Sequence, residues 1–443
     1  MSLRVAIVSA DTFEFEARPL RMARALAADG HSVHVLALPG DGLPTEEELD
    51  HRIRVTRLEV DRRITSALRP LPASARTVLA RAIGLDPRWS ILPATDAHGL
   101  DRLRYPVRRI LELVAHVRRV GPWAEAVVAA APETDVFQTE ALIALPVVRE
   151  AAQRVGGQYV YDVADYQTEG ARVARLPRPV RETLARMERR WARESAGLMA
   201  VSEPVASLVA AHFGIPRPGV VMNCPPAWRL DETRPPTSTR LRDVLNLSQR
   251  RPIVLHHGQF KLDRGIEELV QAADHPALRQ FDPAIVFMGY GRLQPFLAAA
   301  AAQRPDRVFV LPAVPPDQVV DWVAGADVAY LGCPPRTLNL QLTLPNKVFE
   351  CLMAGVPVVA ADGTEQARLV AQESVGRCTT IESVDALAAD LAAILAMPEG
   401  ERHALRQHCR NLGLNKYSWE RHAGPLIDLY RRLDKGLKAQ PVA

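Results

Sequence analysis

The stretch LTLPNKVFECLMAGVPVVA, residues 342–360, contains the clearest structural signal in the chain. Proline suits the first turn of a helix, where its missing N–H costs no hydrogen bond, and glycine suits the residue that ends one. Pro345 and Gly355 therefore predict a helix over 346–354. The apolar run over 356–360 predicts a buried strand directly after it.

The start of this predicted helix has the properties of a phosphate site. Free N–H groups and partial positive charge at a helix N-terminus favour an anion, and Asn346 and Lys347 lie there. Glu350 follows one turn later on roughly the same face, where a carboxylate can accept hydrogen bonds from a ribose diol. By spacing alone, an ordinary helix with a surface glutamate fits equally well.

A second candidate anion site lies in IVLHHGQFKLDRGIEELVQAA, residues 253–273, which has the pattern strand, glycine loop, helix. Gly258 permits a sharp loop, and Lys261 and Arg264 follow it. A glycine loop with two cations that leads into a helix can cradle an anion. Many such loops carry cations only on a solvated edge, so this motif needs the support of the others.

A third junction, IVFMGYGRL over residues 285–293, has Gly289 and Gly291 directly after a predicted strand. This G-x-G turn is compatible with a ligand site, although tight packing is its more common cause.

Apolar runs alternate with helical periodicity in two separate series, which predicts an α/β protein with two doubly wound parallel sheets. The polar, proline-containing run over 229–251 predicts the linker. We therefore expect domains over 1–228 and 252–415, followed by a C-terminal helix over 416–443. Ligands of such sheets bind at the carboxyl ends of the strands, so the expected site is the central cleft between the domains.

Residues 52–123 interrupt the first series and are rich in arginine and proline. Arginines flank the apolar stretch over 110–117, which predicts a basic, amphipathic helical insertion. Such helices bind anionic membranes, and a solvated basic face in an arginine-rich chain is the alternative.

Composition excludes several classes of protein. The net charge is +4 and aromatic residues make up 5% of the chain, which argues against a nucleic-acid partner. The five cysteines form no C-x-x-C pair and have no histidine at zinc-ligand spacing, which indicates a reducing compartment and no metal. The N-terminus MSLRVAIVSA lacks the apolar region of a secretion signal, so we expect a cytoplasmic protein, with peripheral contact to the inner membrane face as an option.

In their order along the chain, these segments resemble the retaining GT-B glycosyltransferases of group 1, the GT4-type family. The similarity is strongest in PNKVFECLMAGVPVVA, residues 345–360. Looser matches are GHSVHVLAL at 30–38, VYDVADY at 160–166, and two segments within 200–226, AVSEPVASLVAAHFGIP and VVMNCPP. The resemblance covers most of the chain except about 52–123, and it implies the GT-B fold of two Rossmann-like domains that face a central cleft.

The resemblance also implies the reaction. A sugar passes from a nucleoside-diphosphate sugar to an acceptor hydroxyl with retention, in polysaccharide or glycoconjugate biosynthesis. Lys261 and Arg264 would stabilise the leaving diphosphate, Glu350 would bind the ribose, and the Val314 backbone would meet the nucleobase. No D-x-D motif is present, so we expect no metal and no other cofactor. The expected donor site consists of Gly258, Gln259, Gly289, Gly291, Val314, Pro345, Asn346, Lys347 and Glu350.

Three residues depart from the family's donor pattern. Gln259 replaces a frequent phosphate-binding arginine, Pro312 replaces a glycine, and Leu342 stands where the first glutamate of a pair is usual.

The acceptor side departs further. Ala164 stands where the family often has histidine, which leaves Asp162 and Asp165 as neighbouring candidates. The segment SADTFEFEARP replaces a double-glycine loop, and its Arg18 either faces the phosphates or forms a surface salt bridge. We expect the acceptor, a glycan, lipid or small molecule, on this side.

Two alternative functions remain open. A nucleotide-sugar 2-epimerase or another GT-B enzyme would act on the donor without this acceptor chemistry. A non-catalytic nucleotide-sugar-binding partner of another transferase would explain Leu342 and Ala164.

Overall fold

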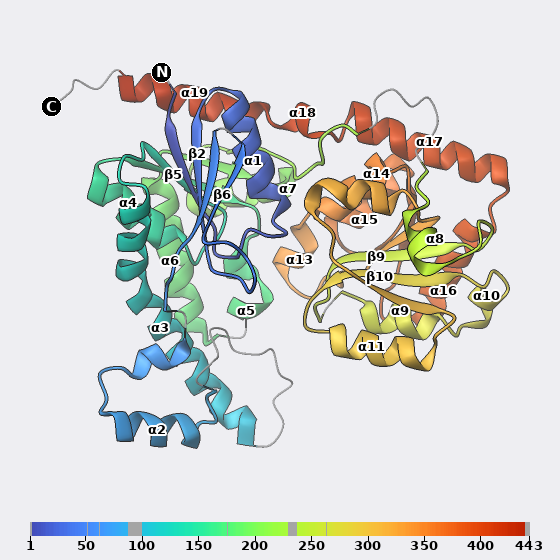
Figure 1. Ribbon diagram of the computed structural model, residues 1–443, viewed down its shortest axis with the longest axis horizontal. Coiled ribbons are helices and arrows are strands. Elements are labelled where there is room, and N and C mark those ends of the chain that lie inside the picture. The colour runs from blue at the N-terminus through green and yellow to red at the C-terminus, as the bar shows by residue number, and fades with distance from the viewer. Residues whose placement is uncertain are drawn as a thin grey trace.

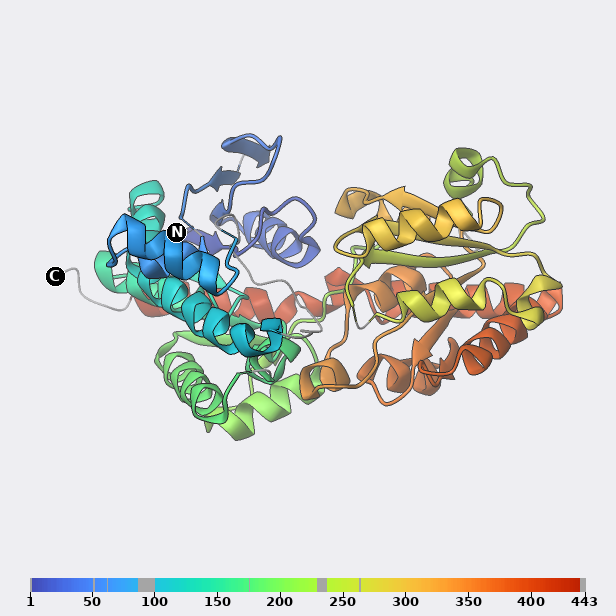
Figure 2. The same ribbon diagram turned by 90° about the horizontal axis from the view of Figure 1, so that it is seen from below.

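The chain forms two α/β domains that lie side by side, and helices from its C-terminal part run along both (Figure 1; Figure 2). The two doubly wound domains predicted from the sequence are confirmed. The structure is a computed structural model that describes residues 2–50, 52–61, 63–86, 100–174, 176–228, 237–262 and 264–438.

The N-terminal sheet has the strand order β3-β4-β2-β1-β5-β6-β7-β8. All pairs are parallel except β3 with β4, and α1 (Ala17–Ala28) connects β1 to its neighbour β2. β1 is central and mostly buried, as expected for a parallel strand with helices on both faces. The strands are β1 (Arg4–Val8), β2 (Ser32–Ala37), β3 (Glu46–Asp50), β4 (Ile53–Arg57), β5 (Val136–Thr139), β6 (Gln158–Val163), β7 (Gly197–Ala200) and β8 (Gly219–Val220). Later helices of this domain are α4 (Leu145–Val155), α5 (Ala171–Ala174), α6 (Arg178–Glu194) and α7 (Glu203–Phe213).

The segment predicted as a helical insertion over 52–123 begins instead with a strand. β4 pairs in parallel with β2, and Ile53 and Val55 are buried while Arg54 between them is exposed. This alternation is typical of a strand with one buried face, and β4 lies between β2 and the edge strand β3. The helical part follows as a short 3-10 helix (Ile64–Leu68), α2 (Ala73–Ala82) and α3 (Leu100–Ala130), and residues 62 and 87–99 lie outside the described residues.

The polar run predicted as the linker over 229–251 has two parts. Residues 229–236 lie outside the described residues. Residues Arg240–Leu245 form α8, and Leu241 is fully buried in the C-terminal core. The second part of the run therefore belongs to the C-terminal domain.

The C-terminal sheet is entirely parallel, with the order β11-β10-β9-β12-β13-β14. Its strands are β9 (Ile253–Gln259), β10 (Ala284–Tyr290), β11 (Val308–Pro312), β12 (Val328–Leu331), β13 (Val358–Ala361) and β14 (Gly376–Thr379). Its helices are α9 (Ile266–Ala272), α10 (Pro276–Arg279), α11 (Gln294–Gln303), α12 (Val319–Val323), α13 (Leu338–Leu342), α14 (Asn346–Met353), α15 (Glu365–Glu373), α16 (Val384–Leu395) and α17 (Glu399–Asn415).

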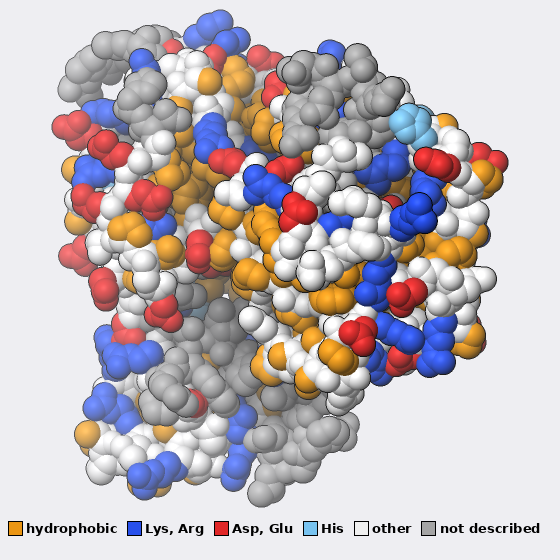
Figure 3. Space-filling model, turned by 45° about the vertical axis from the view of Figure 1, so that its right-hand side comes forward, with side chains coloured by type: hydrophobic (Ala, Val, Ile, Leu, Met, Phe, Trp, Pro, Cys, Tyr) orange, Lys and Arg blue, Asp and Glu red, His pale blue; other side chains and the backbone are white. Residues whose placement is uncertain are grey.

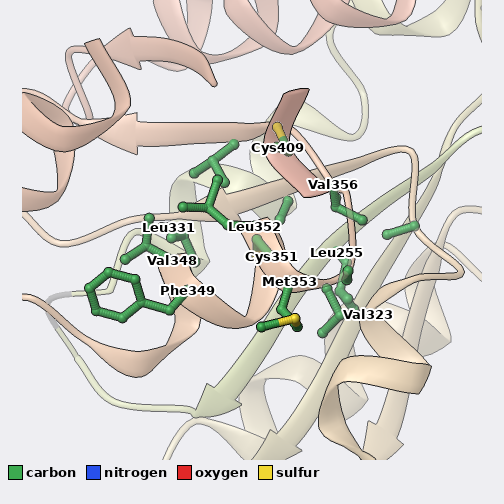
Figure 4. Close-up of a cluster of buried hydrophobic side chains, with 14 of the residues drawn as sticks. Leu255, Val323, Leu331, Val348, Phe349, Cys351, Leu352, Met353, Val356 and Cys409 are labelled. Atoms are coloured by element: carbon green, nitrogen blue, oxygen red, sulfur yellow. The ribbon is translucent and has the colours of Figure 1, made fainter. Parts of the chain in front are cut away.

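Helix α14 is fixed by its apolar face. Val348, Leu352 and Met353 are fully buried in one cluster with Leu255 of β9 and Val323 of α12 (Figure 4). Burying each such side chain stabilises the folded protein by roughly 1.5–3 kcal/mol. This packing places the start of α14 rigidly at the edge of the sheet.

The last helices join the two domains. After α17, which packs on α14, come α18 (Trp419–His422) and α19 (Gly424–Lys438). Leu426 and Tyr430 of α19 are fully buried in the N-terminal core, and the Tyr430 hydroxyl donates to Gln138 Oε1 at 2.6 Å. The chain therefore returns to the N-terminal domain after completing the second one.

Candidate functional site

A cavity of about 300 Å³ lies between the two domains. Its C-terminal wall comes from the carboxyl ends of β9, β10 and β12 and from the start of α14. Its N-terminal wall is the segment between β1 and α1. This is the position that parallel sheets favour for a ligand, because their strand ends leave backbone groups and loops open there.

The start of α14 faces this cavity. Pro345 precedes the helix with an extended backbone and no side chain caps it, so the first-turn N–H groups can bind a ligand. Pro345, Asn346 and Lys347 all line the cavity.

Glu350 is 2% exposed and is held by three side chains. Asn346 Nδ2 donates to its Oε1 at 2.6 Å, and His257 Nε2 lies 3.0 Å from its Oε2. Arg21 reaches across from α1 to Oε1 at 3.5 Å. Burial opposes ionisation, but the hydrogen bond and charge of His257, with Arg21 and Asn346, outweigh it and hold the pKa of Glu350 below its usual value.

The cations in the cavity are Lys347 and Arg264. Burial, followed by repulsion from Arg264, lowers the pKa of Lys347 to about 7. Arg264 donates through one terminal nitrogen to Cys333 Sγ at 2.8 Å. Lys261, which the sequence groups with them, is exposed and does not line the cavity.

The glycines allow two loops to approach closely. A Cβ on Gly258 would lie 2.5 Å from Lys347 Cε, and one on Gly289 would lie 1.9 Å from the Gly258 oxygen. Gly291 packs on the Phe260 backbone and does not line the cavity, in contrast to its prediction as a donor contact. The predicted donor residues that do line the cavity are Gly258, Gln259, Arg264, Gly289, Val314, Pro345, Asn346, Lys347 and Glu350.

The three acceptor-side candidates lie outside the cavity lining. Arg18 is 4% exposed and makes a two-pronged ion pair with fully buried Asp162, at 2.7 and 2.6 Å. Its remaining nitrogen donates to the Val221 carbonyl at 2.6 Å. Neither sequence interpretation of Arg18, a phosphate contact or a surface salt bridge, is therefore correct. Asp165 is exposed and accepts hydrogen bonds from Asn339 and Thr343 of the other domain.

The sequence reasoning missed the N-terminal wall. Asp11, Phe15 and Glu16 line the cavity there, and the Phe15 ring lies 4.8 Å from that of Tyr290 across the cleft. The segment SADTFEFEARP carries no periodic or spacing signal that would have singled them out. His257 was also missed, although its place directly before Gly258 at a strand end was a usable signal.

The family described as Glycosyl transferases group 1 matches residues 251–397, which hold most of the C-terminal wall. The matched residues lie within the C-terminal domain. A curated relative, the D-inositol 3-phosphate glycosyltransferase of Xylanimonas cellulosilytica, is 29% identical over 224 residues. The match covers 48% of this chain and 51% of the relative, so the chain spans about half the length of the curated relative it matches.

Solved structures extend the likeness to the whole chain. Sucrose-phosphate synthase from Thermosynechococcus elongatus superposes with a TM-score of 0.68 at 18% identity, over 98% of this chain and 100% of that one. HepE from Anabaena in complex with UDP-glucose gives 0.59 at 16% identity, over 99% and 100%. WaaG, a glycosyltransferase involved in lipopolysaccharide biosynthesis, gives 0.60 at 16% identity, over 96% and 98%. The GT-B fold expected for a group 1 glycosyltransferase is thereby confirmed.

Proposed function

We propose that this chain is a glycosyltransferase that moves a sugar from a nucleoside-diphosphate sugar to an acceptor hydroxyl, with retention and without a metal. One observation carries the proposal. A single interdomain cavity combines an uncapped helix start, two cations and the carboxylate of Glu350, in a group 1 glycosyl transferase domain.

These groups match the parts of a nucleoside diphosphate. The leaving diphosphate develops negative charge, which the α14 N-terminus, Lys347 and Arg264 are placed to stabilise. Glu350 is held as a carboxylate one turn away, suited to the ribose hydroxyls. Val314 also lines the cavity, and its backbone is the proposed contact for the base. The HepE complex with UDP-glucose supports a donor of this class.

Metal independence and retention are the finer parts of the proposal. Within the described ranges, no group of three or more His, Cys, Asp or Glu side chains is arranged to hold a metal ion. The fixed cations can neutralise the leaving group by themselves. Retention is what the family resemblance implies, with an oxygen of the leaving phosphate accepting the acceptor's proton on the same face.

A thermal-shift screen against UDP, GDP, dTDP, ADP and CMP, with and without EDTA, tests the donor site. We expect one nucleoside diphosphate to raise the melting temperature equally in both conditions, because it binds only the folded protein. A shift that requires metal, or no shift with any nucleotide, would contradict the proposal. With the matching sugar donor, NMR of the product's anomeric proton reports retention. Turnover without any acceptor would indicate the epimerase alternative, and binding without turnover the non-catalytic partner.

We also propose that the chain contacts an anionic membrane through the α2–α3 region. No residue of α2 is buried, and Val78 on it is 68% exposed. Ile110 and Val117 of α3 are 50% and 60% exposed. Of the nearby arginines, Arg81 of α2 and Arg118 of α3 are exposed, whereas Arg108, Arg109 and Arg119, predicted as part of a basic face, are buried. Basic faces with exposed apolar side chains suit a lipid surface. No helix in the described residues has the length and hydropathy to cross a membrane.

Vesicle co-sedimentation tests this contact. We expect binding to vesicles with anionic lipid, little binding to neutral ones, and a loss of several-fold in Val78→Asp and Ile110→Asp. Val244→Asp is the matched control, because Val244 is 59% exposed on the C-terminal domain. Equal binding to both vesicle types, or equal loss in the control, would refute the assignment.

A nucleic-acid partner gains no support from the face drawn in Figure 3, where basic and acidic side chains are interspersed.

A further inference from the structure

The two walls of the interdomain cavity carry opposite charge. Lys347 and Arg264 line the C-terminal wall, whereas Asp11 and Glu16 line the N-terminal wall. No lysine or arginine of the N-terminal domain is among the residues found to line the cavity in the described chain. If the donor diphosphate lies on the cationic wall, as the proposed function requires, the acceptor meets the acidic one.

Glu16 is one of the two carboxylates of this acidic wall. It stands directly before α1, and its Oε2 accepts a hydrogen bond from Ser9 Oγ at 2.5 Å. No ion pair to Glu16 and no donor to its Oε1 is found among the described residues. That oxygen is therefore available to a ligand in the cavity.

Further carboxyl groups surround Glu16. Asp11 lies on the same segment, and Glu140 follows β5, which is the neighbour of β1 in the sheet. Burial, with repulsion from Asp11 and against the Ser9 hydrogen bond, raises the pKa of Glu16 to about 7. Burial and repulsion from Glu16 raise the pKa of Glu140 well above its usual value.

The arginine closest to Glu16 in the sequence is bound to other partners. Arg18 lies two residues from Glu16, but all three of its nitrogens are used by Asp162 and the Val221 carbonyl. Above about pH 7, where Glu16 is ionised, a phosphate at this wall would meet Asp11 and Glu16, and no lysine or arginine among the described residues of the N-terminal domain lines the cavity to offset them. Like charges in a partly desolvated cavity repel strongly. A hydroxyl or an ammonium group can instead donate a hydrogen bond to Glu16.

We propose that Glu16 binds the acceptor and that the acceptor presents a hydroxyl or a protonated amine of a sugar or polyol to it, never a phosphate. This inference rests on the proposed function for the position of the donor. It assigns Glu16, in the N-terminal domain, a role in acceptor specificity.

The test compares matched acceptors on the full chain, with the nucleoside diphosphate from the screen held at saturation. The probes are glucose, glucosamine and glucose 6-phosphate, with inositol and inositol 3-phosphate as a second set. Binding is measured at pH 8, where Glu16 is ionised, by saturation-transfer NMR. Sugar transfer is measured by product mass in separate reactions that contain the matching nucleotide-sugar donor. We expect the amine and neutral probes to bind at least tenfold more tightly than their phosphorylated partners.

Variants then connect this preference to Glu16. Glu16→Gln should lower affinity for glucosamine at least fivefold and weaken the discrimination against phosphate, whereas Glu16→Asp should keep the preference. Glu14→Gln is the matched control, because Glu14 is exposed on the same segment and does not line the cavity. Unchanged nucleoside diphosphate affinity shows that each variant is folded.

Three results would overturn the inference while leaving the donor site intact. They are tighter binding of a phosphorylated probe by the wild type, identical selectivity in Glu16→Gln and wild type, and no binding of any probe while the nucleotide still binds. Failure of the nucleotide to bind would instead refute the proposed function, and this inference with it.

Discussion

Replacing Glu350 with glutamine should lower the affinity for the nucleoside diphosphate by roughly tenfold to a hundredfold. A hydrogen bond to a charged group contributes about 1.5–3 kcal/mol, and each 1.4 kcal/mol changes affinity tenfold. Glutamine keeps the volume but turns one carboxylate oxygen into an amide donor. The new NH2 group must face either Asn346 and Arg21, which contact Oε1 in the wild type, or His257, which contacts Oε2. Either orientation weakens contacts that now hold the carboxylate.

A ligand without the ribose hydroxyls identifies the contact. Calorimetry with the 2′,3′-dideoxy nucleotide should show weaker binding to the wild type, and no further loss in Glu350→Gln. If the two losses add instead, Glu350 does not bind the diol. The Cys333→Ser variant alters the same cavity beside Arg264, the proposed phosphate contact, and should keep the full dependence on the diol.

The affinity for the nucleoside diphosphate should fall as the pH rises above 7, by up to tenfold per pH unit. Burial and Arg264 lower the pKa of Lys347 to about 7 in the free protein. A bound diphosphate favours the ammonium form and raises that pKa, so binding takes up a proton above pH 7 and none well below it. The terminal phosphate itself has a pKa of about 6 and is already ionised in this range.

Calorimetry between pH 6 and 9, in buffers of different ionisation enthalpy, measures the proton uptake directly. We expect about one proton per nucleotide at pH 8 and a flat affinity profile in Lys347→Gln. Glu16 also has a pKa of about 7, so Glu16→Gln serves as the control and should keep the slope. A wild-type affinity that is constant from pH 7 to 9 would exclude this role for Lys347.

The sequence predicts the C-terminal sheet well because its strands are continuous apolar runs. β12, Val328–Leu331, is such a run, and all four of its residues are buried. β13 starts at Val358, two residues later than expected, because Pro357 has no N–H for the ladder. β3, with the sequence EEELD, was not predicted, since an antiparallel edge strand can be polar on both sides.

The site residues also differ in whether a local sequence pattern predicts them. Asn346, Lys347 and Glu350 share one helix, so their spacing in the sequence fixes their geometry. Arg21 contacts Glu350, and Glu16 lines the cavity, only because the two domains meet, which no local pattern encodes. Likewise, a pair separated like Arg18 and Asp162 cannot be recognised before the sheet order is known.

The return of α19 to the first domain has a consequence for the order of synthesis. Chains generally fold domain by domain as they emerge from the ribosome, beginning at the N-terminus. Here the first domain needs Leu426 and Tyr430 to close its core, and these residues are made after the whole second domain. Until Leu426 and Tyr430 have been made, the first domain therefore keeps an open apolar face, and the second domain is the earlier of the two to complete its core.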